Sequence, residues 1–429
     1  MIMVIIMNII DIITKKKNKE ELTREEIAFA VNEFVNGNIK DYQMSSLLMA
    51  IVLNGMNFDE TYNLTEIMLN SGDKIDLSKV EGIKVDKHST GGVGDKTSLV
   101  VLPLAASCGI KIAKMSGRGL GFTGGTIDKL ESIEGFKTNI SEKSFIDQVN
   151  RINIALVSQS GNLVPADKKI YALRDVTGTT ESIPLIASSI MSKKLASGSD
   201  KILLDVKVGK GAFMKNLDDA KKLAKTMVKI GNKYGKKTVA VLTNMDYPLG
   251  YTIGNGLEVA EAIETLDGKG EKEFTNLCLL LTSYMVSLGK NIEIDEAYEE
   301  VLKNYKNKNG LRKLNEFVSM QGGDLRKVKL EKNKVKILAS KSGYITDIDT
   351  LELASLTNSL GAGRNKKEDL IDHGVGVKLY KKINDYVYEG EKIMDVFTSK
   401  DIDKEEYLKT ITISNRRIRS FDIVYEIIK

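Results

Sequence analysis

From about residue 82 the chain alternates short apolar strands with helices, and this alternation constrains the fold more than any other feature. Strands are expected at GIKVD (82–86), KIAKM (111–115), IALVSQ (154–159), KILLDVKV (201–208) and TVAVLTN (238–244). Helices are expected between them, at 99–109, 142–152, 217–235 and 254–268. Such alternation favours a mostly parallel sheet that is covered by helices.

Three further regions depart from this alternation. Residues 23–72 show a helical pattern, with a capping box at Thr23 and Glu26. Residues 167–198 are again helical, so we expect the chain to return there to the helical layer. Beyond about residue 335, short apolar runs with turn residues indicate a small β-rich unit. We therefore predict an α/β protein: a small all-helical domain, a large mixed and mostly parallel α/β domain, and a C-terminal α+β unit.

Composition excludes several classes of protein. With 42% hydrophobic and 28% charged residues, the 429-residue chain is globular rather than disordered. Its 63 basic and 58 acidic residues nearly balance, which predicts no nucleic-acid partner. Cys108 and Cys278 lie in apolar predicted helices, so we expect buried thiols and a cytoplasmic protein.

The first 13 residues are apolar but lack the features of a signal peptide, and they are too short to span a membrane. We predict no membrane association. Met7 can begin a normal first helix, so we expect residues 1–6 to be either an extension ahead of it or an artefact of the assigned start site.

Two glycine-rich loops carry the densest chemical signal. The first is KHSTGGVGDKTS (87–98), directly after a strand and before a helix, where backbone N–H groups can enclose an anion. Asp95 separates Gly94 from Lys96, so the spacing of a nucleotide-triphosphate loop is not met. The second loop, 114–126, follows the next strand and would face the same crevice. The alternative is that these are glycine-rich turns without a ligand.

His88 is one of only two histidines, and it stands inside the first loop. An imidazole beside a bound phosphate can hydrogen-bond to a leaving group or protonate it. The alternative is a structural histidine.

A second group of polar residues comes from the helical segment. Ser182, Pro184 and Gly198 predict a helix over 183–197, which places Ser189 and Lys193 four residues apart on one face. Arg174 lies just upstream and can reach the same space. These donors suit a flat ring with carbonyl groups, although a basic helix end that matches the helix dipole is the alternative. Lys194 points about 100° away, so its replacement is expected to be nearly silent.

At these residues the chain resembles a known family. The segments KHSTGGVGDKTS, KMSGRGLGFTGGTIDKLE, PADKKIYALRDVTGT and SIPLIASSIMSKK, in this order, closely resemble the pyrimidine-nucleoside and thymidine phosphorylases. The likeness runs from about Met7 to the C-terminus. It implies a helical domain (1–71 and 169–199), an α/β domain split around it (72–168 and 200–335), a C-terminal α+β domain (336–429), and a homodimer formed through the helical domains.

The resemblance also implies the roles of particular residues. Phosphate would be held by Lys87, Ser89, Ser98, Lys114, Ser116 and Thr126, and the pyrimidine base by Arg174, Ser189 and Lys193, with His88, Arg174 and Lys193 acting in catalysis. No organic cofactor is implied. Some family members bind a potassium ion, which would here use backbone oxygens of Gly94, Lys96, Leu249 and Thr252 and the carboxylate of Glu261. Lys96 departs from relatives with an uncharged residue at this position, and its ammonium group can weaken such a site.

The reaction implied is the reversible phosphorolysis of pyrimidine nucleosides, such as uridine, thymidine and deoxyuridine, to the free base and a pentose 1-phosphate. Its partners are inorganic phosphate and the nucleoside. Two alternatives stay open at this point: a phosphoribosyltransferase of the anthranilate phosphoribosyltransferase type, and a nucleoside-binding protein without catalytic activity. A phosphate-dependent activity would separate the three.

Overall fold

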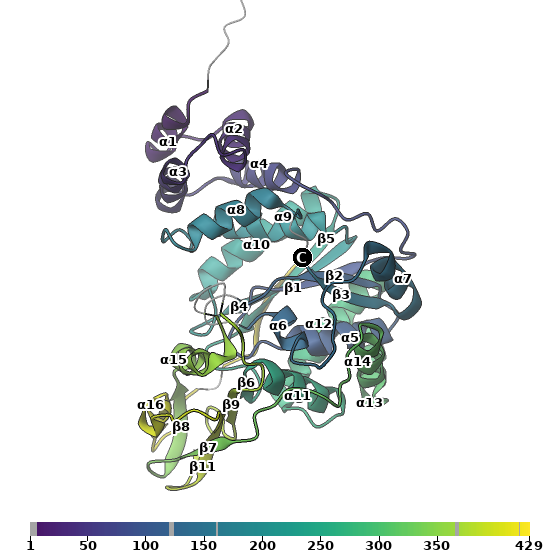
Figure 1. The fold of residues 1–429 in the computed structure, drawn as a ribbon, viewed down its shortest axis with the longest axis vertical. Helices are drawn as coiled ribbons and strands as arrows, with labels where there is room; N and C mark the ends of the chain where they lie inside the picture. The colour runs from purple at the N-terminus through teal and green to yellow at the C-terminus, as the bar shows by residue number, and fades with distance from the viewer. Residues whose placement is uncertain (1–6, 120–123, 160–161, 365–368, 420) are drawn as a thin grey trace, which may run out of the picture.

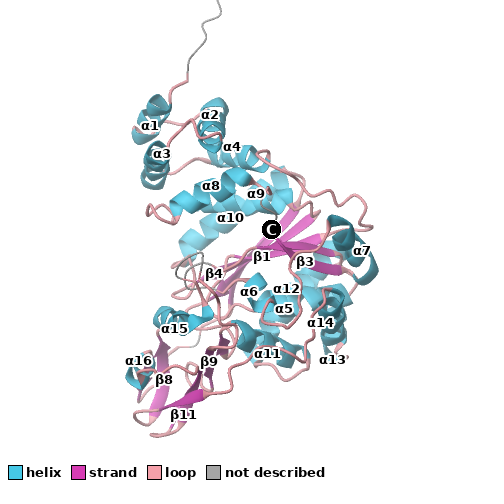
Figure 2. Cartoon of the chain, in the orientation of Figure 1, coloured by secondary structure: helices cyan, strands magenta, loops and turns pink. Residues whose placement is uncertain are grey.

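The computed structural model describes residues 7–119, 124–159, 162–364, 369–419 and 421–429. Residues 1–6, which we expected to be an extension or a start-site artefact, lie outside this description. The described chain forms a helical layer, a central sheet with helices on both faces, and a C-terminal domain with antiparallel sheets (Figures 1 and 2). The predicted fold class is confirmed.

The helical layer combines two separate stretches of the chain. Its members are α1 (Ile9–Lys17), α2 (Arg24–Val35), α3 (Asp41–Asn54), α4 (Phe58–Leu69), α8 (Pro165–Arg174) and α9 (Ile183–Ala196). The predicted capping box begins α2, where Glu26 N donates to Thr23 Oγ1 at 3.2 Å and Thr23 N donates to Glu26 Oε2 at 2.7 Å. Apolar side chains of both stretches, such as Leu64 and Leu185, share one core.

The central sheet places its strands in the order β1-β4-β5-β13. The strands β1 (Val85–Ser89), β4 (Lys201–Val208) and β5 (Lys237–Asn244) are parallel, and β13 (Val424–Ile428) pairs antiparallel with β5. A bridge from Lys84 to Lys111 continues the sheet to the parallel pair β2 (Ile112–Ser116) and β3 (Ile154–Ser158). The carboxyl ends of β1 and β2 therefore lie at one edge, as the sequence predicted.

Successive residues of each strand face opposite cores. On β4, Ile202, Leu204 and Val206 pack toward the helical layer, whereas Leu203 packs on the opposite side. The helices of this domain are α5 (Thr97–Ser107), α6 (Thr126–Leu130), α7 (Glu142–Ile152), α10 (Leu217–Lys233), α11 (Asn255–Leu266), α12 (Lys272–Lys290), α13 (Ile294–Lys306) and α14 (Asn309–Met320). Cys108 and Cys278 are buried free thiols, as predicted.

The C-terminal domain has its own apolar core. Its elements are β7 (Lys334–Leu338), β8 (Gly343–Ile348), α15 (Thr350–Thr357), β9 (Gly376–Leu379), β10 (Tyr386–Val387), β11 (Lys392–Phe397), α16 (Lys404–Lys409) and β12 (Ile411–Ser414). Two strands cross the predicted domain boundaries. β6 (Thr252–Ile253) pairs with β9, and β13, inside the range 336–429, belongs to the central sheet.

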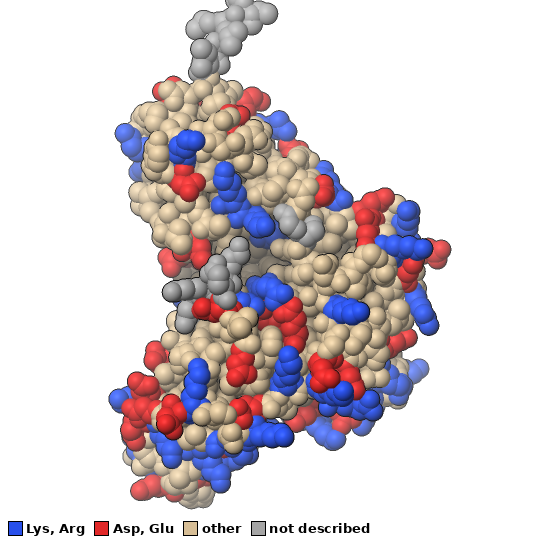
Figure 3. Space-filling model, in the orientation of Figure 1, with Lys and Arg blue, Asp and Glu red and all other residues tan. Residues whose placement is uncertain are grey.

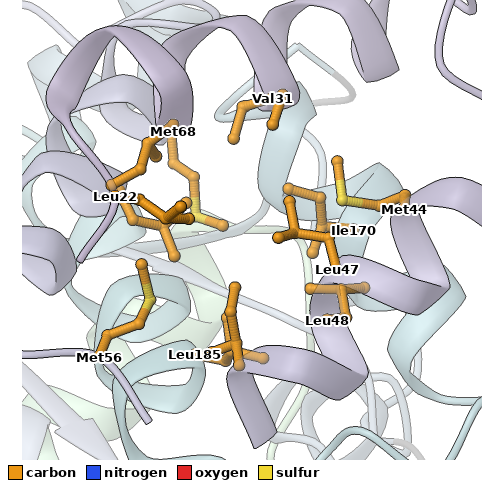
Figure 4. A pocket seen from close by; sticks show the side chains of 13 residues that line it. Leu22, Val31, Met44, Leu47, Leu48, Met56, Met68, Ile170 and Leu185 are labelled. Carbon is orange, nitrogen blue, oxygen red and sulfur yellow. The ribbon is translucent and has the colours of Figure 1, made fainter. Parts of the chain in front are cut away.

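A small cavity lies inside the helical layer (Figure 4). Its volume is about 20 Å³, and only apolar side chains line it, among them Leu47, Met68 and Leu185. Such a cavity offers no partner for a charged or polar ligand. It is a packing defect between helices and no candidate binding site.

Among the described helices, none is by itself long and apolar enough to cross a membrane. The pair α12 and α13 meets the criteria of length and composition only when taken together across a bend of 118°.

Candidate active site

The first glycine-rich loop leaves β1 at Ser89 and enters α5 at Thr97. Asp95 closes it: its carboxylate accepts hydrogen bonds from Thr97 N (3.1 Å), Thr97 Oγ1 (2.6 Å) and the Ser89 hydroxyl. Gly91 and Gly94 have φ angles of 85° and 74°, which glycine adopts without strain. The residue that breaks the nucleotide-triphosphate spacing is therefore a structural part of the loop.

Lys87 lies completely buried beneath this loop. Its ammonium donates to Thr97 Oγ1 at 2.5 Å and pairs with Asp205 Oδ2 at 3.2 Å. Lys207 pairs with the same Asp205 oxygen at 2.9 Å. Since an ammonium group has three N–H donors, Lys87 has one that is without a partner among the described residues.

Lys114 joins the second loop to the first. Its ammonium donates to the carbonyl of Lys87 at 2.5 Å and to Asp86 Oδ1 at 3.2 Å, which again leaves one donor without a described partner. Burial lowers the pKa of Lys114 to about 7, and the positive charges of Lys194 and Lys87 act in the same direction, against the carboxylate of Asp86. Lys114 is thus poised to gain or lose its proton near neutral pH.

His88 is half-buried near the end of β1. Burial, with the positive charges of Lys194 and Lys114, lowers the pKa of His88 well below its usual range, although Asp86 opposes this. The imidazole is therefore neutral at neutral pH and offers one N–H donor and one acceptor. This form suits hydrogen bonding to a ligand carbonyl.

The remaining predicted phosphate ligands surround the two loops. Ser98 is buried in the first turn of α5, Ser116 ends β2, and Thr126 begins α6. Residues 120–123 of the second loop lie outside the described chain. Its described part is held by Asp128, which accepts from Gly119 N at 2.6 Å and pairs with Arg118 at 3.3 Å. The roles of these three hydroxyl residues stay predictions.

On α9, Ser189 and Lys193 meet as their spacing predicted. The ammonium of Lys193 donates to Ser189 Oγ at 2.9 Å and to Asp167 Oδ2 of α8 at 2.6 Å. Its side chain is 23% exposed, so it is held in place but still reached by solvent. One donor has no hydrogen-bond partner among the described residues, as in Lys87 and Lys114, although the ammonium lies 5.8 Å from the centre of the Tyr171 ring.

Arg174 is buried at the end of α8. Its guanidinium donates to the carbonyls of Thr179 (3.0 Å), Thr180 (2.8 Å) and Leu185 (3.2 Å). Two of its five N–H donors remain without a described partner. Arg174 therefore orders the turn before α9, and its role in binding a ligand stays a prediction.

The structure contradicts the basis of the expectation that replacement of Lys194 is nearly silent. Its side chain does point away from Lys193, but it is buried and donates to Asp86 Oδ2 at 2.6 Å. Asp86 thus holds Lys114 with one oxygen and Lys194 with the other, and both cations lower its pKa to about 2 against the effect of burial. Because Lys194 follows Lys193 on α9, its side chain leaves the helix about 100° away from the predicted base site. It lies at the contact between the helical layer and the sheet.

Two groups of donors consequently face each other across the two layers. The charges of Lys193 and Lys194 on α9 both act on His88 near the end of β1. Figure 3 shows basic side chains on both sides of a hollow in the middle of the molecule. The arrangement can hold an anion at the sheet edge and a hydrogen-bonding ring at the helical layer.

The predicted potassium site has a different occupant. The ammonium of Lys96 donates to Leu249 O (2.6 Å), Thr252 O (3.0 Å) and Glu261 Oε2 (2.7 Å). These are three of the oxygens that were expected to bind the ion. The backbone oxygen of Lys96 itself accepts the Leu99 amide at 3.0 Å. The residues therefore do not fit a bound potassium ion in this arrangement.

The buried charges beneath the loops were missed by sequence reasoning. Asp86, Asp205 and Lys207 stand within strands, where helices on both faces favour unbroken apolar runs. A charged residue in such a strand must be paired, and that signal was present in VDKHS and KILLDVKV.

Comparison with known proteins places the chain in a family. Residues 10–72 match the glycosyl transferase family helical bundle domain, 81–310 its a/b domain, and 344–416 the pyrimidine nucleoside phosphorylase C-terminal domain. A pyrimidine-nucleoside phosphorylase of Staphylococcus epidermidis is 54% identical over 96% of this chain and 97% of its own length. The chain belongs to the pyrimidine-nucleoside phosphorylase family. A pyrimidine-nucleoside phosphorylase of Geobacillus stearothermophilus is 51% identical over 98% of this chain and 99% of its own.

The fold is shared more widely than the family. The crystal structure of anthranilate phosphoribosyltransferase from Thermus thermophilus matches with a TM-score of 0.58 at 15% identity, over 72% of this chain and 99% of the other. At that identity the likeness shows a common fold alone. It explains why the phosphoribosyltransferase alternative was reasonable from the loops.

Proposed function

We propose that the protein catalyses the reversible phosphorolysis of pyrimidine nucleosides, including uridine, thymidine and deoxyuridine, to the free base and a pentose 1-phosphate. The observation that carries this is identity above 50% with pyrimidine-nucleoside phosphorylases over nearly the whole chain. The site's chemistry agrees, because lysine donors line the sheet edge and the helical layer carries donors for a ring with carbonyls. We further propose a homodimer in the cytoplasm.

In the reaction a phosphate oxygen forms a bond to C1′ while the bond from C1′ to the base nitrogen breaks, so the configuration at C1′ inverts. Lys87 and Lys114 each bring one unpaired N–H donor to the phosphate. The departing base gains the electron pair, and donors that bind this charge more strongly than the neutral base accelerate the step. We assign that role to Lys193 and Arg174, and the neutral imidazole of His88 can donate to a base carbonyl.

The experiment that tests this function compares uridine cleavage with and without phosphate. We expect cleavage only with phosphate, and ribose 1-phosphate of inverted configuration as the product. Equal release of free ribose without phosphate would show hydrolysis instead. Consumption of phosphoribosyl pyrophosphate with anthranilate, in the absence of nucleoside cleavage, would show the phosphoribosyltransferase reaction.

A second expected result concerns Lys114 and pH. Sulfate stays a dianion between pH 6 and 9, so its competition with phosphate reports the charge of the site. Since the pKa of Lys114 is about 7, its positive charge is present below that pH and is lost above it. We expect sulfate inhibition to weaken above pH 7 by up to about tenfold per pH unit.

The matched control is Lys114→Arg, whose guanidinium stays charged throughout this range. Its sulfate inhibition is expected to lack the slope above pH 7. His88 does not titrate there, because its pKa lies well below the usual range. Sulfate inhibition of the unmodified protein that is constant from pH 6 to 9 would contradict the assignment of Lys114 to the anion.

A further inference from the structure

We propose that the ammonium group of Lys96 is a built-in monovalent cation, which occupies the place of a potassium ion and makes the protein independent of that ion. The proposal concerns the charge and the contacts of Lys96, so it does not depend on which reaction the protein catalyses.

The cage around this ammonium is complete. Lys96 has three N–H donors, and all of them are used, by Leu249 O, Thr252 O and Glu261 Oε2. This distinguishes it from Lys87, which keeps a donor without a described partner. The Lys96 side chain is fully buried, so no water replaces these contacts.

The cage also has the chemistry of an alkali-ion site. Backbone carbonyls are the oxygens that replace the hydration shell of potassium in proteins, and the Glu261 carboxylate adds a negative charge. That carboxylate is fixed by further hydrogen bonds from Tyr251 N (2.6 Å), Thr252 N (2.9 Å) and Thr252 Oγ1 (2.5 Å). A single positive charge is needed at its centre, and Lys96 supplies it. A second cation would be repelled by the first at contact distance.

Close approach of the backbone supports the same conclusion. A Cβ atom on Gly94 would lie 2.9 Å from Leu249 O, and one on Gly250 would lie 2.9 Å from Lys96 Nζ. Both glycines have φ near +70°, at 74° and 69°. The chain is therefore folded tightly around the ammonium and leaves no further room beside it.

The position of Lys96 gives the built-in cation a structural task. It stands at the end of the first glycine-rich loop, immediately before α5, whereas Leu249 and Thr252 lead into β6, which pairs with β9 of the C-terminal domain. The ammonium thus connects the predicted phosphate loop to the junction with the C-terminal domain. Because the cation is covalently attached to the chain, we expect this connection to be independent of the salt that is present.

The test compares the thermal stability of three proteins in potassium chloride and in tetramethylammonium chloride at equal ionic strength. For the unmodified protein we expect the same Tm and the same activity in both salts. Lys96→Thr removes the ammonium and opens space in the cage. We expect its Tm to fall by about 5–10 °C in tetramethylammonium chloride, since a buried carboxylate loses its partner.

Potassium should restore much of that loss in Lys96→Thr, with a Tm that rises with the potassium concentration. A polar pocket of about 310 Å³ is lined by Thr252 and Glu261 among others, so it lies beside two residues of the cage. Lys96→Met is the matched control, because it fills the same space without charge. It should be destabilised in both salts, and potassium should not rescue it.

Each outcome decides the proposal. A Tm or an activity of the unmodified protein that increases with potassium overturns it, whatever the variants do. A Lys96→Thr protein that is as stable as the parent without potassium also overturns it, since the ammonium would then carry no structural charge. Equal rescue of Lys96→Thr and Lys96→Met would show a general salt effect and overturn it as well. Loss of nucleoside cleavage with these Tm results unchanged would instead contradict the proposed function.

Discussion

Lys193→Ala is expected to lower kcat by roughly 10²- to 10³-fold while the KM for phosphate barely changes. The ammonium of Lys193 is fixed by Asp167 and Ser189. Under the proposed function, its remaining donor would bind charge that forms on the base only as the glycosidic bond breaks. An interaction made only in the transition state lowers kcat and kcat/KM together when it is lost. Steady-state kinetics with both substrates varied measures this.

The control for Lys193→Ala is Lys221→Ala, which removes a lysine of α10 from a surface ion pair with Glu426 of β13. It should leave the kinetics unchanged. Because Lys193→Ala also leaves Asp167 without its cation, Tm is recorded beside the kinetics to separate misfolding from lost catalysis. A rise in the KM for phosphate as large as the fall in kcat would show that Lys193 acts on phosphate and not on the base.

The local patterns of the sequence were sufficient to predict the main helices and strands and their order along the chain. KILLDVKV became β4 at its predicted bounds, because a short segment of mostly branched apolar residues, followed by glycine-rich turn residues, is typical of a buried strand. The pairing of Ser189 with Lys193 followed from the helical period alone. The placement of both glycine-rich loops at one edge of the sheet was predicted because β1 and β2 are parallel.

Long-range charge pairing could not be predicted in the same way. Lys96 and Glu261 are 165 residues apart, and Lys194 and Asp86 are 108 apart. Periodicity shows which direction a side chain leaves a helix, but it does not show what the tertiary fold places there. Replacement of Lys194 was therefore expected to be nearly silent, although Lys194 donates to a buried carboxylate. The return of β13 to the central sheet escaped prediction for the same reason.

The second large effect is expected from replacing the buried carboxylate of Asp86. Asp86→Asn is expected to lower the free energy of unfolding by about 3–5 kcal/mol, since breaking a buried ion pair leaves uncompensated charge. Asp86 serves two buried cations at once, Lys114 at 3.2 Å and Lys194 at 2.6 Å. An asparagine preserves the shape and removes the negative charge, so the loss measures charge rather than packing. The midpoint of urea unfolding, followed by circular dichroism, reports it.

The sign of the pH dependence separates this effect from a simple loss of hydrogen bonds. Without Asp86 the pKa of Lys114 falls further in the folded state, so the unfolded chain binds more protons and stability rises with pH. The deficit of Asp86→Asn relative to the parent should therefore be larger at pH 6 than at pH 9. Asp347→Asn is the matched control: it breaks an exposed pair with Lys210, whose side chains are 47% and 56% exposed, and should cost at most about 1 kcal/mol at either pH. Equal and small losses in the two variants would mean that Asp86 does not connect the helical layer to the sheet through charge.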